Sequence, residues 1–348
     1  MTVEVNVMKI AILGPVYTKQ YFGGVATFDE NLAIAYKKIS KENEVYLYSK
    51  QIKKQFQNSY KINIYPISIL SATRQNAFDI IIASLDYAVY LPLMKARKKV
   101  YFLHGFFSLS SYTPIKTVFA VMYQKLFLRY ADYIIGNSSF TCFINREIYN
   151  INSDGSVSLG ASYDYIYNLN QNKSIKKEPN SILFTGRLVE AKKIEIIVEA
   201  INVLQKRNNQ SYILRIVGDG ELKSTLVKYV KEYNLNVKFY DRVSQSEIAK
   251  FYQMSQIFIS LNPSEPFGIT FCEALLAGCE IVCPATGGQI EFLSKYPHLV
   301  EIIKDVSAAT IADAILKLSE RDSVDYVDED DFLYDNTAKG ILDIIGEG

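Results

Sequence analysis

Short apolar runs alternate with segments of helical periodicity along the whole chain. The runs are rich in Ile, Val and Leu, and most end in a turn that contains Gly, Pro, Asn or Ser. Strands that are buried on both faces have such continuous apolar sequences, and their alternation with helices is typical of parallel sheets. The pattern therefore predicts an α/β protein with strands at residues 9–16, 44–48, 79–83, 99–103 and 133–135, and again at 182–185, 213–217, 237–240, 257–261 and 280–282.

A polar stretch without hydrophobic periodicity separates the two series of strands and predicts a linker. We expect a first domain at residues 1–168, the linker at 169–181 and a second domain at 182–325. An acidic tail with a short helix follows at 326–348. Ligands of doubly wound sheets bind at the carboxyl ends of the strands, so the turns after each predicted strand are where we expect chemistry.

Composition describes an ordinary folded protein. Among 348 residues, 49% are hydrophobic and 22% are charged, and the net charge is +1, which does not suggest nucleic acid as a partner. The four cysteines and two histidines show no metal-ligand spacing, and the first residues do not resemble a signal peptide. We expect reduced, buried cysteines and a cytoplasmic protein that touches at most the inner face of the membrane.

Two segments allow a second interpretation. Residues 117–130 form an aromatic, apolar helix with few charges, for which a core helix of the first domain is favoured and a membrane-touching surface is the minority interpretation. Asp328-Glu329-Asp330 matches a pattern that can hold a divalent metal, but it lies in a polar acidic run without a preceding strand. We expect no metal there.

The stretch Asn262–Glu273 contains the most informative pattern. Glu265 and Glu273, separated by seven residues, bracket a turn between an apolar strand and an apolar helix. A helix that begins directly after a strand directs free N–H groups and the positive end of its dipole outward, which favours an anion. One carboxylate lies on the loop and the other in the first helical turns, so both can face one ligand.

Cations and glycines follow other predicted strands. Arg187 and Lys192 span a strand-to-helix turn, where a guanidinium and an ammonium suit phosphate oxygens. Gly23-Gly24 and Gly287-Gly288 are further turns at which main-chain N–H groups can approach a ligand. The glycine spacing that dinucleotide binding requires is missing, so an NAD enzyme is disfavoured.

Together these motifs resemble the retaining GT-B glycosyltransferases of glycosyltransferase family 4. The similarity covers nearly the whole chain in the expected order, and the paired glutamates with the Arg/Lys pair are its specific part. The resemblance implies two Rossmann-like domains that face a central cleft, a UDP- or GDP-sugar donor, and a glycan or lipid-linked acceptor. It implies no cofactor and no metal requirement, and a last helix that crosses back to the first domain.

The same resemblance implies roles for individual residues. Arg187 and Lys192 would hold the diphosphate, Glu265 would face the donor sugar, and Glu273 would accept hydrogen bonds from the ribose. His104 matches the histidine that touches the transferring sugar. Further donor contacts are implied for Gly23, Gly24, Gly186, Asp241, Val243, Phe267, Gly268, Ile269 and Thr270, with the main-chain N–H of Phe271 beside them.

The sequence departs from the family pattern at Lys193, where a glycine is usual, at Leu159-Gly160, where Asn-Gly is common, and in its short C-terminal part. Two other functions stay open: a non-catalytic sugar-nucleotide-binding subunit, and a GT-B-type nucleotide-sugar epimerase. The base, the sugar, the acceptor and the oligomeric state are not predicted by the sequence.

Overall fold

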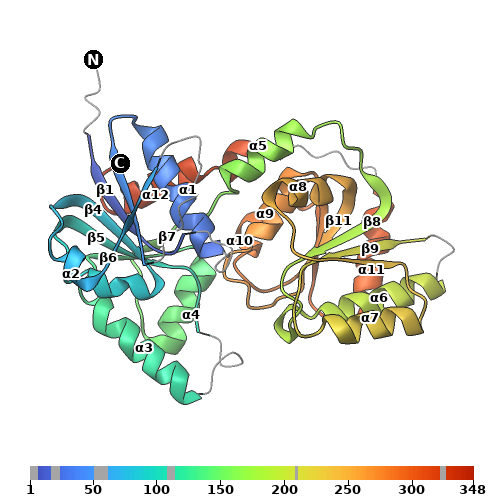
Figure 1. The fold of residues 1–348 in the computed structure, drawn as a ribbon. Coiled ribbons are helices and arrows are strands. Elements are labelled where there is room, and N and C mark those ends of the chain that lie inside the picture. Colours follow the sequence, from blue (N-terminus) through green and yellow to red (C-terminus); the bar gives the residue numbers. More distant parts are fainter. Residues whose placement is uncertain (1–6, 17–23, 51–61, 108–113, 208–210, 322–326) are drawn as a thin grey trace. The chain divides into compact units, whose positions relative to one another are not determined.

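The structure is a computed structural model that describes residues 7–16, 24–50, 62–107, 114–207, 211–321 and 327–348. The chain forms two compact units, of which unit 1 comprises Met1–Ser162 and Asp331–Gly348 and unit 2 comprises Tyr163–Asp330. Each unit contains one parallel sheet with helices on its faces (Figure 1). The predicted α/β class with two parallel sheets is confirmed.

Unit 1 has a seven-stranded sheet in the order β3-β2-β1-β4-β5-β6-β7. All neighbours are parallel, and β1 lies between β2 and β4, with Ile10 paired to Val45 on one side and Ile80 on the other. The strand order reverses at β1, which marks the edge above β1 and β4 as the place for a ligand. The strands are β1 (Lys9–Leu13), β2 (Glu44–Ser49), β3 (Asn63–Pro66), β4 (Phe78–Ser84), β5 (Ala96–Leu103), β6 (Tyr133–Gly136) and β7 (Gly155–Ser156).

The helices of unit 1 are α1 (Gly24–Ile39), α2 (Ile69–Ala72), the 3-10 helix η1 (Leu85–Tyr90), α3 (Pro114–Leu128), α4 (Ser139–Tyr149) and α12 (Tyr334–Ile344). Although α12 is the last helix of the chain, it packs on α1. The main chain of Phe332 and Tyr334 passes so close to Gly160 that a Cβ there would lie 2.5 Å from the Tyr334 nitrogen. The glycine of the Leu159-Gly160 pair is therefore required by packing.

Unit 2 repeats the same winding with six strands, in the order β10-β9-β8-β11-β12-β13. The neighbouring strands are again parallel. Counted from β8, this is the strand order of unit 1 without its last strand, and the reversal lies between β8 and β11. The strands are β8 (Glu178–Thr185), β9 (Ile213–Val217), β10 (Val237–Tyr240), β11 (Ser255–Ile259), β12 (Glu280–Pro284) and β13 (Val300–Ile303).

Amphipathic helices cover this sheet. In α6, Ile194, Ile197, Val198, Ile201 and Leu204 recur at helical spacing and are buried in one cluster with apolar residues of the strands. The helices are α5 (Tyr163–Gln171), η2 (Glu190–Lys192), α6 (Ile194–Arg207), α7 (Lys223–Glu232), α8 (Gln245–Met254), α9 (Ile269–Leu276), α10 (Ile290–Leu293) and α11 (Ala308–Ser319); η3 (Glu329–Phe332) joins the units in sequence.

Two expectations need correction. Residues 169–181, predicted as a linker, lie within unit 2 as the end of α5, a turn and the start of β8. Their polar side chains concealed an amphipathic helix whose buried face is Tyr165, Ile166 and Leu169. The core interpretation of residues 117–130 is also wrong, because α3 exposes most of its large apolar side chains.

The strands β3, β7 and β13 were not predicted, because each is short and lacks a long apolar run. Cys272, Cys279 and Cys283 are buried free thiols, as expected. Within the described residues, no helix combines the length and the apolar character that crossing a bilayer requires.

Candidate functional site

The carboxyl edge of the unit 2 sheet collects most of the predicted donor-binding residues. Because all strands are parallel, the loops that follow β8, β10, β11 and β12 lie at one edge. The loop after β8 carries Gly186 and Arg187, and the loop after β10 carries Asp241 and Val243. Glu265 follows β11.

An ion pair connects two of these loops. The Lys192 Nζ lies 2.6 Å from the Glu265 Oε2, and the side chains keep 23% and 17% of their accessible surface. The Asn262 amide donates to the same carboxylate oxygen at 2.9 Å. The pair brings the cation after β8 against the acid after β11, so two residues that the sequence separates by 73 positions share one site.

The N-terminus of α9 opens at this edge. Gly268 is its N-cap with φ +95°, and a Cβ there would lie 2.7 Å from the Phe271 ring. The N–H groups of Ile269 and Thr270 have no acceptor among the described residues, whereas the Phe271 N–H donates to the Gly268 oxygen at 2.9 Å. The expected contact through the Phe271 N–H is therefore less suited to a ligand than those of the two preceding residues.

The loop that contains Glu265 is fixed by its neighbour after β12. The Gly288 N–H donates to the Glu265 main-chain oxygen at 2.8 Å, and the Thr286 hydroxyl donates to the Pro263 oxygen at 2.9 Å. Phe267 is buried, with its ring 5.1 Å from that of Phe292. Its side chain holds the loop, so a donor contact at this position can come only from the main chain.

Glu273 lies in the second turn of α9. Burial raises the pKa of its carboxyl to about 7, and a hydrogen bond from Tyr252 opposes this rise. The Tyr165 hydroxyl holds the helix at this point by donating to the Glu273 main-chain oxygen at 2.6 Å. The carboxyl therefore changes charge near neutral pH.

Arg187 and Asp241 differ in their partners. Arg187 is exposed and has no ion-pair or hydrogen-bond partner for its guanidinium among the described residues. Asp241 forms an ion pair with Lys223. Val243 is half-buried. The free guanidinium is suited to an anionic ligand, whereas the Asp241 carboxylate is already engaged.

In unit 1, His104 follows β5 and belongs to a chain of hydrogen bonds that the sequence did not predict. The Ser84 hydroxyl lies 2.8 Å from the His104 Nε2 and donates to the Asp29 Oδ1 at 2.7 Å. The direction of the Ser84–His104 hydrogen bond depends on the tautomer of the imidazole: when the hydroxyl proton goes to Asp29, Nε2 carries the hydrogen and Nδ1 is left as an acceptor. Ser84 pairs with Phe102 in the sheet, which brings the ends of β4 and β5 together.

The surroundings of His104 are aromatic. The rings of Phe28 and Phe102 lie 4.7 and 4.9 Å from the imidazole. Burial lowers the pKa of His104 to about 3 and raises that of Asp29 well above its usual value. The imidazole is therefore neutral at physiological pH. The Asp29 Oδ2 is buried without a hydrogen-bond partner among the described residues.

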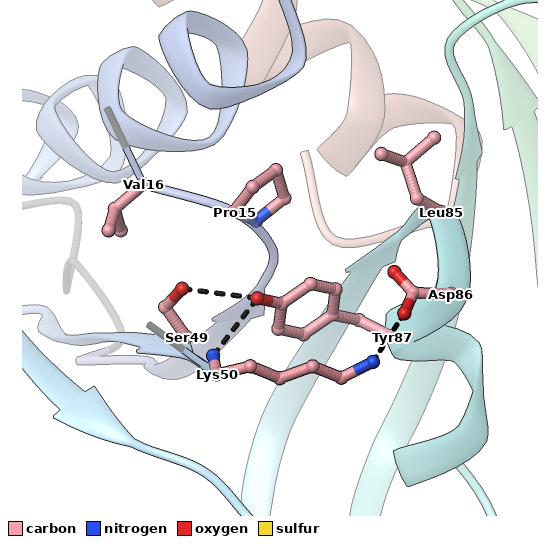
Figure 2. Close-up of a pocket in the computed structure, with 7 residues that line it drawn as sticks. All are labelled: Pro15, Val16, Ser49, Lys50, Leu85, Asp86 and Tyr87. Atoms are coloured by element: carbon pink, nitrogen blue, oxygen red, sulfur yellow. Dashed lines mark hydrogen bonds and ion pairs between the residues drawn. The ribbon is translucent and has the colours of Figure 1, made fainter. Parts of the chain in front are cut away.

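The two glycines after β1 cannot both be placed. Gly24 is the first residue of α1, and Gly23 lies outside the described residues. A pocket of about 170 Å³ is lined by Pro15, Val16, Ser49, Lys50, Leu85, Asp86 and Tyr87 (Figure 2). These residues follow or end β1, β2 and β4, so the pocket lies at the carboxyl edge of the unit 1 sheet.

Polar groups and strain both occur in this pocket. Lys50 and Asp86 form an ion pair, and the Tyr87 hydroxyl accepts from the Lys50 main-chain N–H at 2.9 Å (Figure 2). Leu85 has φ +51°, a left-handed conformation that a leucine rarely adopts. Such strain concentrates at functional sites. The sequence did not indicate this pocket, because Leu85-Asp86 has the pattern of an ordinary turn.

Metal ligands do not cluster in the part of the chain that the structure describes: no group of three or more His, Cys, Asp or Glu side chains is placed to hold an ion. In the acidic run, the Asp330 N–H donates to the Asp328 carboxylate at 3.0 Å.

Comparison with known proteins shows similarity to a family model over the second part of the chain. Residues 167–329 match the family model described as glycosyl transferases group 1. An uncharacterized glycosyltransferase of Methanocaldococcus jannaschii is 26% identical over 42% of this chain and 38% of its own length. The glycogen synthase of Mycoplasma mobile is 30% identical over 37% of this chain and 26% of its own. The chain thus aligns with well under half the length of these two relatives.

Among solved structures, Anabaena HepE in complex with UDP and glucose is similar with a TM-score of 0.65. The match covers 98% of this chain and 97% of that one at 16% identity. The two parallel Rossmann-like sheets and this likeness show that the chain has the GT-B fold.

Proposed function

We propose that this protein is a retaining glycosyltransferase that moves a hexosyl unit from a UDP- or GDP-sugar to a hydroxyl group of a glycan or lipid-linked acceptor. The observation that carries the proposal is the ion pair of Lys192 and Glu265 at the carboxyl edge of unit 2. The likeness to a GT-B protein in complex with UDP and glucose supports a nucleotide-sugar donor.

The diphosphate is the group that the edge of unit 2 suits best. When the bond between the anomeric carbon and the diphosphate oxygen breaks, negative charge grows on the leaving group. Arg187 offers a free guanidinium, and Lys192 keeps two of its three N–H donors after one is given to Glu265. Donors fixed before the reaction stabilise this charge without rearrangement. The N–H groups of Ile269 and Thr270 extend the same arrangement.

Glu273 would bind the ribose. An ionised carboxylate accepts hydrogen bonds from both ribose hydroxyls, whereas the protonated form offers fewer acceptors. Because the pKa of Glu273 is about 7, the free protein holds a mixture of both forms near neutral pH. Binding of the ribose would favour the ionised form and release the proton.

His104 would contact the transferring sugar as a neutral imidazole, with Nδ1 as a hydrogen-bond acceptor for a hydroxyl group. Ser84 and Asp29 are positioning residues in this proposal, because they act on the sugar only through the tautomer of His104. Retention follows when the acceptor oxygen attacks from the leaving-group face. The bond from the anomeric carbon to the phosphate oxygen breaks, the new glycosidic bond forms, and the acceptor proton passes to the departing phosphate.

The acceptor would bind at the pocket of unit 1. Asp86 and Lys50 offer an acceptor and a donor to sugar hydroxyls, and Pro15 and Leu85 offer apolar contact (Figure 2). The reaction would need no metal, since cations of the protein neutralise the leaving group. Addition of EDTA should therefore leave the transfer rate unchanged. A location in the cytoplasm remains a prediction.

A panel of UDP-, GDP- and ADP-sugars in a thermal-unfolding assay tests the proposal. The preferred donor, present at 100 times its Kd, should stabilise the protein by about 2.7 kcal/mol. Product analysis by NMR with that donor and simple glycan acceptors should then show the anomeric configuration of the donor. A protein that binds none of these donors, or that binds one and converts it without any acceptor, would contradict the proposal.

A further inference from the structure

Helix α3 of unit 1 exposes an unusually apolar surface. Phe119 and Met122 keep 67% and 61% of their accessible surface, which is far more than a core helix allows. The exposed set comprises Ile115, Val118, Phe119, Met122, Tyr123, Leu126 and Tyr130, which we call the α3 face. Contiguous apolar surface of this kind marks an interaction site in a folded protein.

The spacing of these residues places them on one side of the helix. They recur at intervals of three and four positions, whereas the buried Thr117 and Leu128 lie on the opposite side, which faces the rest of unit 1. At roughly 100° per residue, Lys116 falls on one border of the exposed stripe and Lys125 on the other. The helix therefore has apolar side chains toward unit 1 and also toward solvent, and cations lie along both borders of the solvent side.

Cations predominate in the sequence around α3, although η1, which packs on α3, carries Asp86. Residues 87–131 contain no Asp or Glu, and they contain seven cations: Lys95, Arg97, Lys98, Lys99, Lys116, Lys125 and Arg129. Arg129 lies over the ring of Tyr130 at the end of the helix. Aromatic residues and cations beside an apolar stripe are the combination that settles at the boundary of lipid headgroups and acyl chains.

We propose that the α3 face docks on the surface of a bilayer that contains anionic lipid. The apolar side chains would enter the region below the headgroups, and Lys116, Lys125 and Arg129 would contact phosphate groups. A symmetric dimer through the same face would bring two sets of cations together, which opposes association of two copies. The charge thus selects lipid as the occupant.

Docking through α3 would hold unit 1 at the membrane, and this unit carries the proposed acceptor pocket. Together with the proposed function, on which this step rests, the surface favours a lipid-linked acceptor over a free glycan. The docking itself requires neither donor nor transfer, so vesicle binding can be measured independently of activity.

Flotation of the full chain with vesicles tests the proposal. We expect binding to vesicles of phosphatidylcholine with 30% phosphatidylglycerol. The affinity for these vesicles should rise about fivefold for each Lys or Arg that contacts anionic lipid, and added salt should weaken it. The double variant Phe119→Ser/Met122→Ser should lose at least about tenfold in partitioning. Lys125→Gln should lose about fivefold on the anionic vesicles and little on pure phosphatidylcholine.

Tyr167→Ser is the matched control, because Tyr167 of α5 in unit 2 is 64% exposed and lies outside the α3 face. It should bind vesicles as the wild type does, and all variants should keep the wild-type thermal midpoint and donor-induced shift. Equal vesicle binding by Phe119→Ser/Met122→Ser and the wild type would overturn the proposal. The proposal would also be overturned if light scattering showed that the wild type is a dimer that does not bind vesicles and that the double variant is a monomer.

Discussion

The carboxyl edges of the two sheets differ in the polar groups at the centre of each edge. In unit 2, charged side chains remain partly exposed, with Lys192 paired to Glu265 and Arg187 without a partner among the described residues. In unit 1, the hydrogen bonds of Asp29, Ser84 and His104 are enclosed by aromatic rings, and the pKa shifts favour neutral forms. The first edge is suited to a charged group and the second to neutral hydroxyls.

The strand order is the same up to the last strand of unit 1, so the fold does not produce this difference. The residues at the ends of the strands do: the loops after β8 and β11 present cations and acids, whereas β4 ends in Ser84 and β5 is followed by His104, next to the ion pair of Lys50 and Asp86. Function thus depends on the side chains that a shared fold places at its edge. The following predictions test whether the two edges divide the work as proposed.

Removal of a cation from the unit 2 edge should have the largest effect. Arg187→Ala and Lys192→Ala should each lower kcat/KM by about 10²-fold or more, since each removes a fixed donor to the leaving diphosphate. Steady-state kinetics with the preferred donor measure this loss. Lys250→Ala on α8 is the control, because it removes an exposed lysine elsewhere in unit 2. Wild-type kinetics in either site variant would contradict the assignment.

Disruption of the unit 1 relay should have a smaller effect. Ser84→Ala removes both hydrogen bonds and should lower kcat by about tenfold, which corresponds to about 1.4 kcal/mol for a lost hydrogen bond. The chain has only two histidines, so ¹⁵N-histidine NMR with His298→Gln for assignment can observe His104 alone. The wild type should show the Nε2–H tautomer without titration from pH 5 to 8. An unchanged tautomer in Ser84→Ala would exclude the positioning role.

Glu273 should connect donor affinity to pH. Donor affinity of the wild type should rise several-fold between pH 6 and 8, because the carboxylate ionises with a pKa of about 7. Glu273→Gln should bind the donor weakly and without this dependence. Calorimetric titrations across the range measure both. A parallel pH dependence in the variant would assign the titration to another group.

The same raised pKa predicts a cost in stability. The Glu273 carboxyl binds its proton more tightly in the folded protein than in the unfolded chain. The resulting contribution to the free energy of unfolding is fully present below the unfolded pKa of about 4.5, and it is lost as the pH rises through about 7. Glu273→Gln should therefore raise the thermal midpoint relative to the wild type at pH 8 more than at pH 5. A midpoint difference that shrinks with rising pH would contradict the sign.

Lys193 should show the smallest effect, on stability alone. It adopts φ +49° after η2, at the position where the family usually has glycine. Lys193→Gly should relieve about 1 kcal/mol of strain and raise the thermal midpoint of unit 2 by about 2–4 °C. Lys193→Ala keeps a Cβ and should bring no comparable gain. If Lys193→Gly lowered the thermal midpoint instead, the contacts of the lysine side chain would stabilise the fold by more than the left-handed backbone conformation destabilises it.

Apolar runs were sufficient to predict most strands and the loops at their carboxyl ends, which placed Arg187, Lys192 and Glu265 at one edge. They could not reveal Asp29 and Ser84, because this contact depends on the pairing of β4 with β5 and on the packing of α1. They also misassigned α3, since apolar residues occur around the whole helix and periodicity cannot tell which side faces solvent. The polar surface of α5 concealed a helix for the same reason.

Isothermal titration calorimetry tests the central claim most directly by comparing the affinity of the protein for the preferred nucleoside diphosphate with its affinity for the corresponding nucleoside. In Arg187→Ala/Lys192→Ala, the account predicts that the affinity for the diphosphate falls by about 100-fold or more, because charged hydrogen bonds contribute about 1.5–3 kcal/mol each. The affinity for the nucleoside should stay at the wild-type value. An unchanged diphosphate affinity, or an equal loss for both ligands, would show that these cations do not hold the diphosphate.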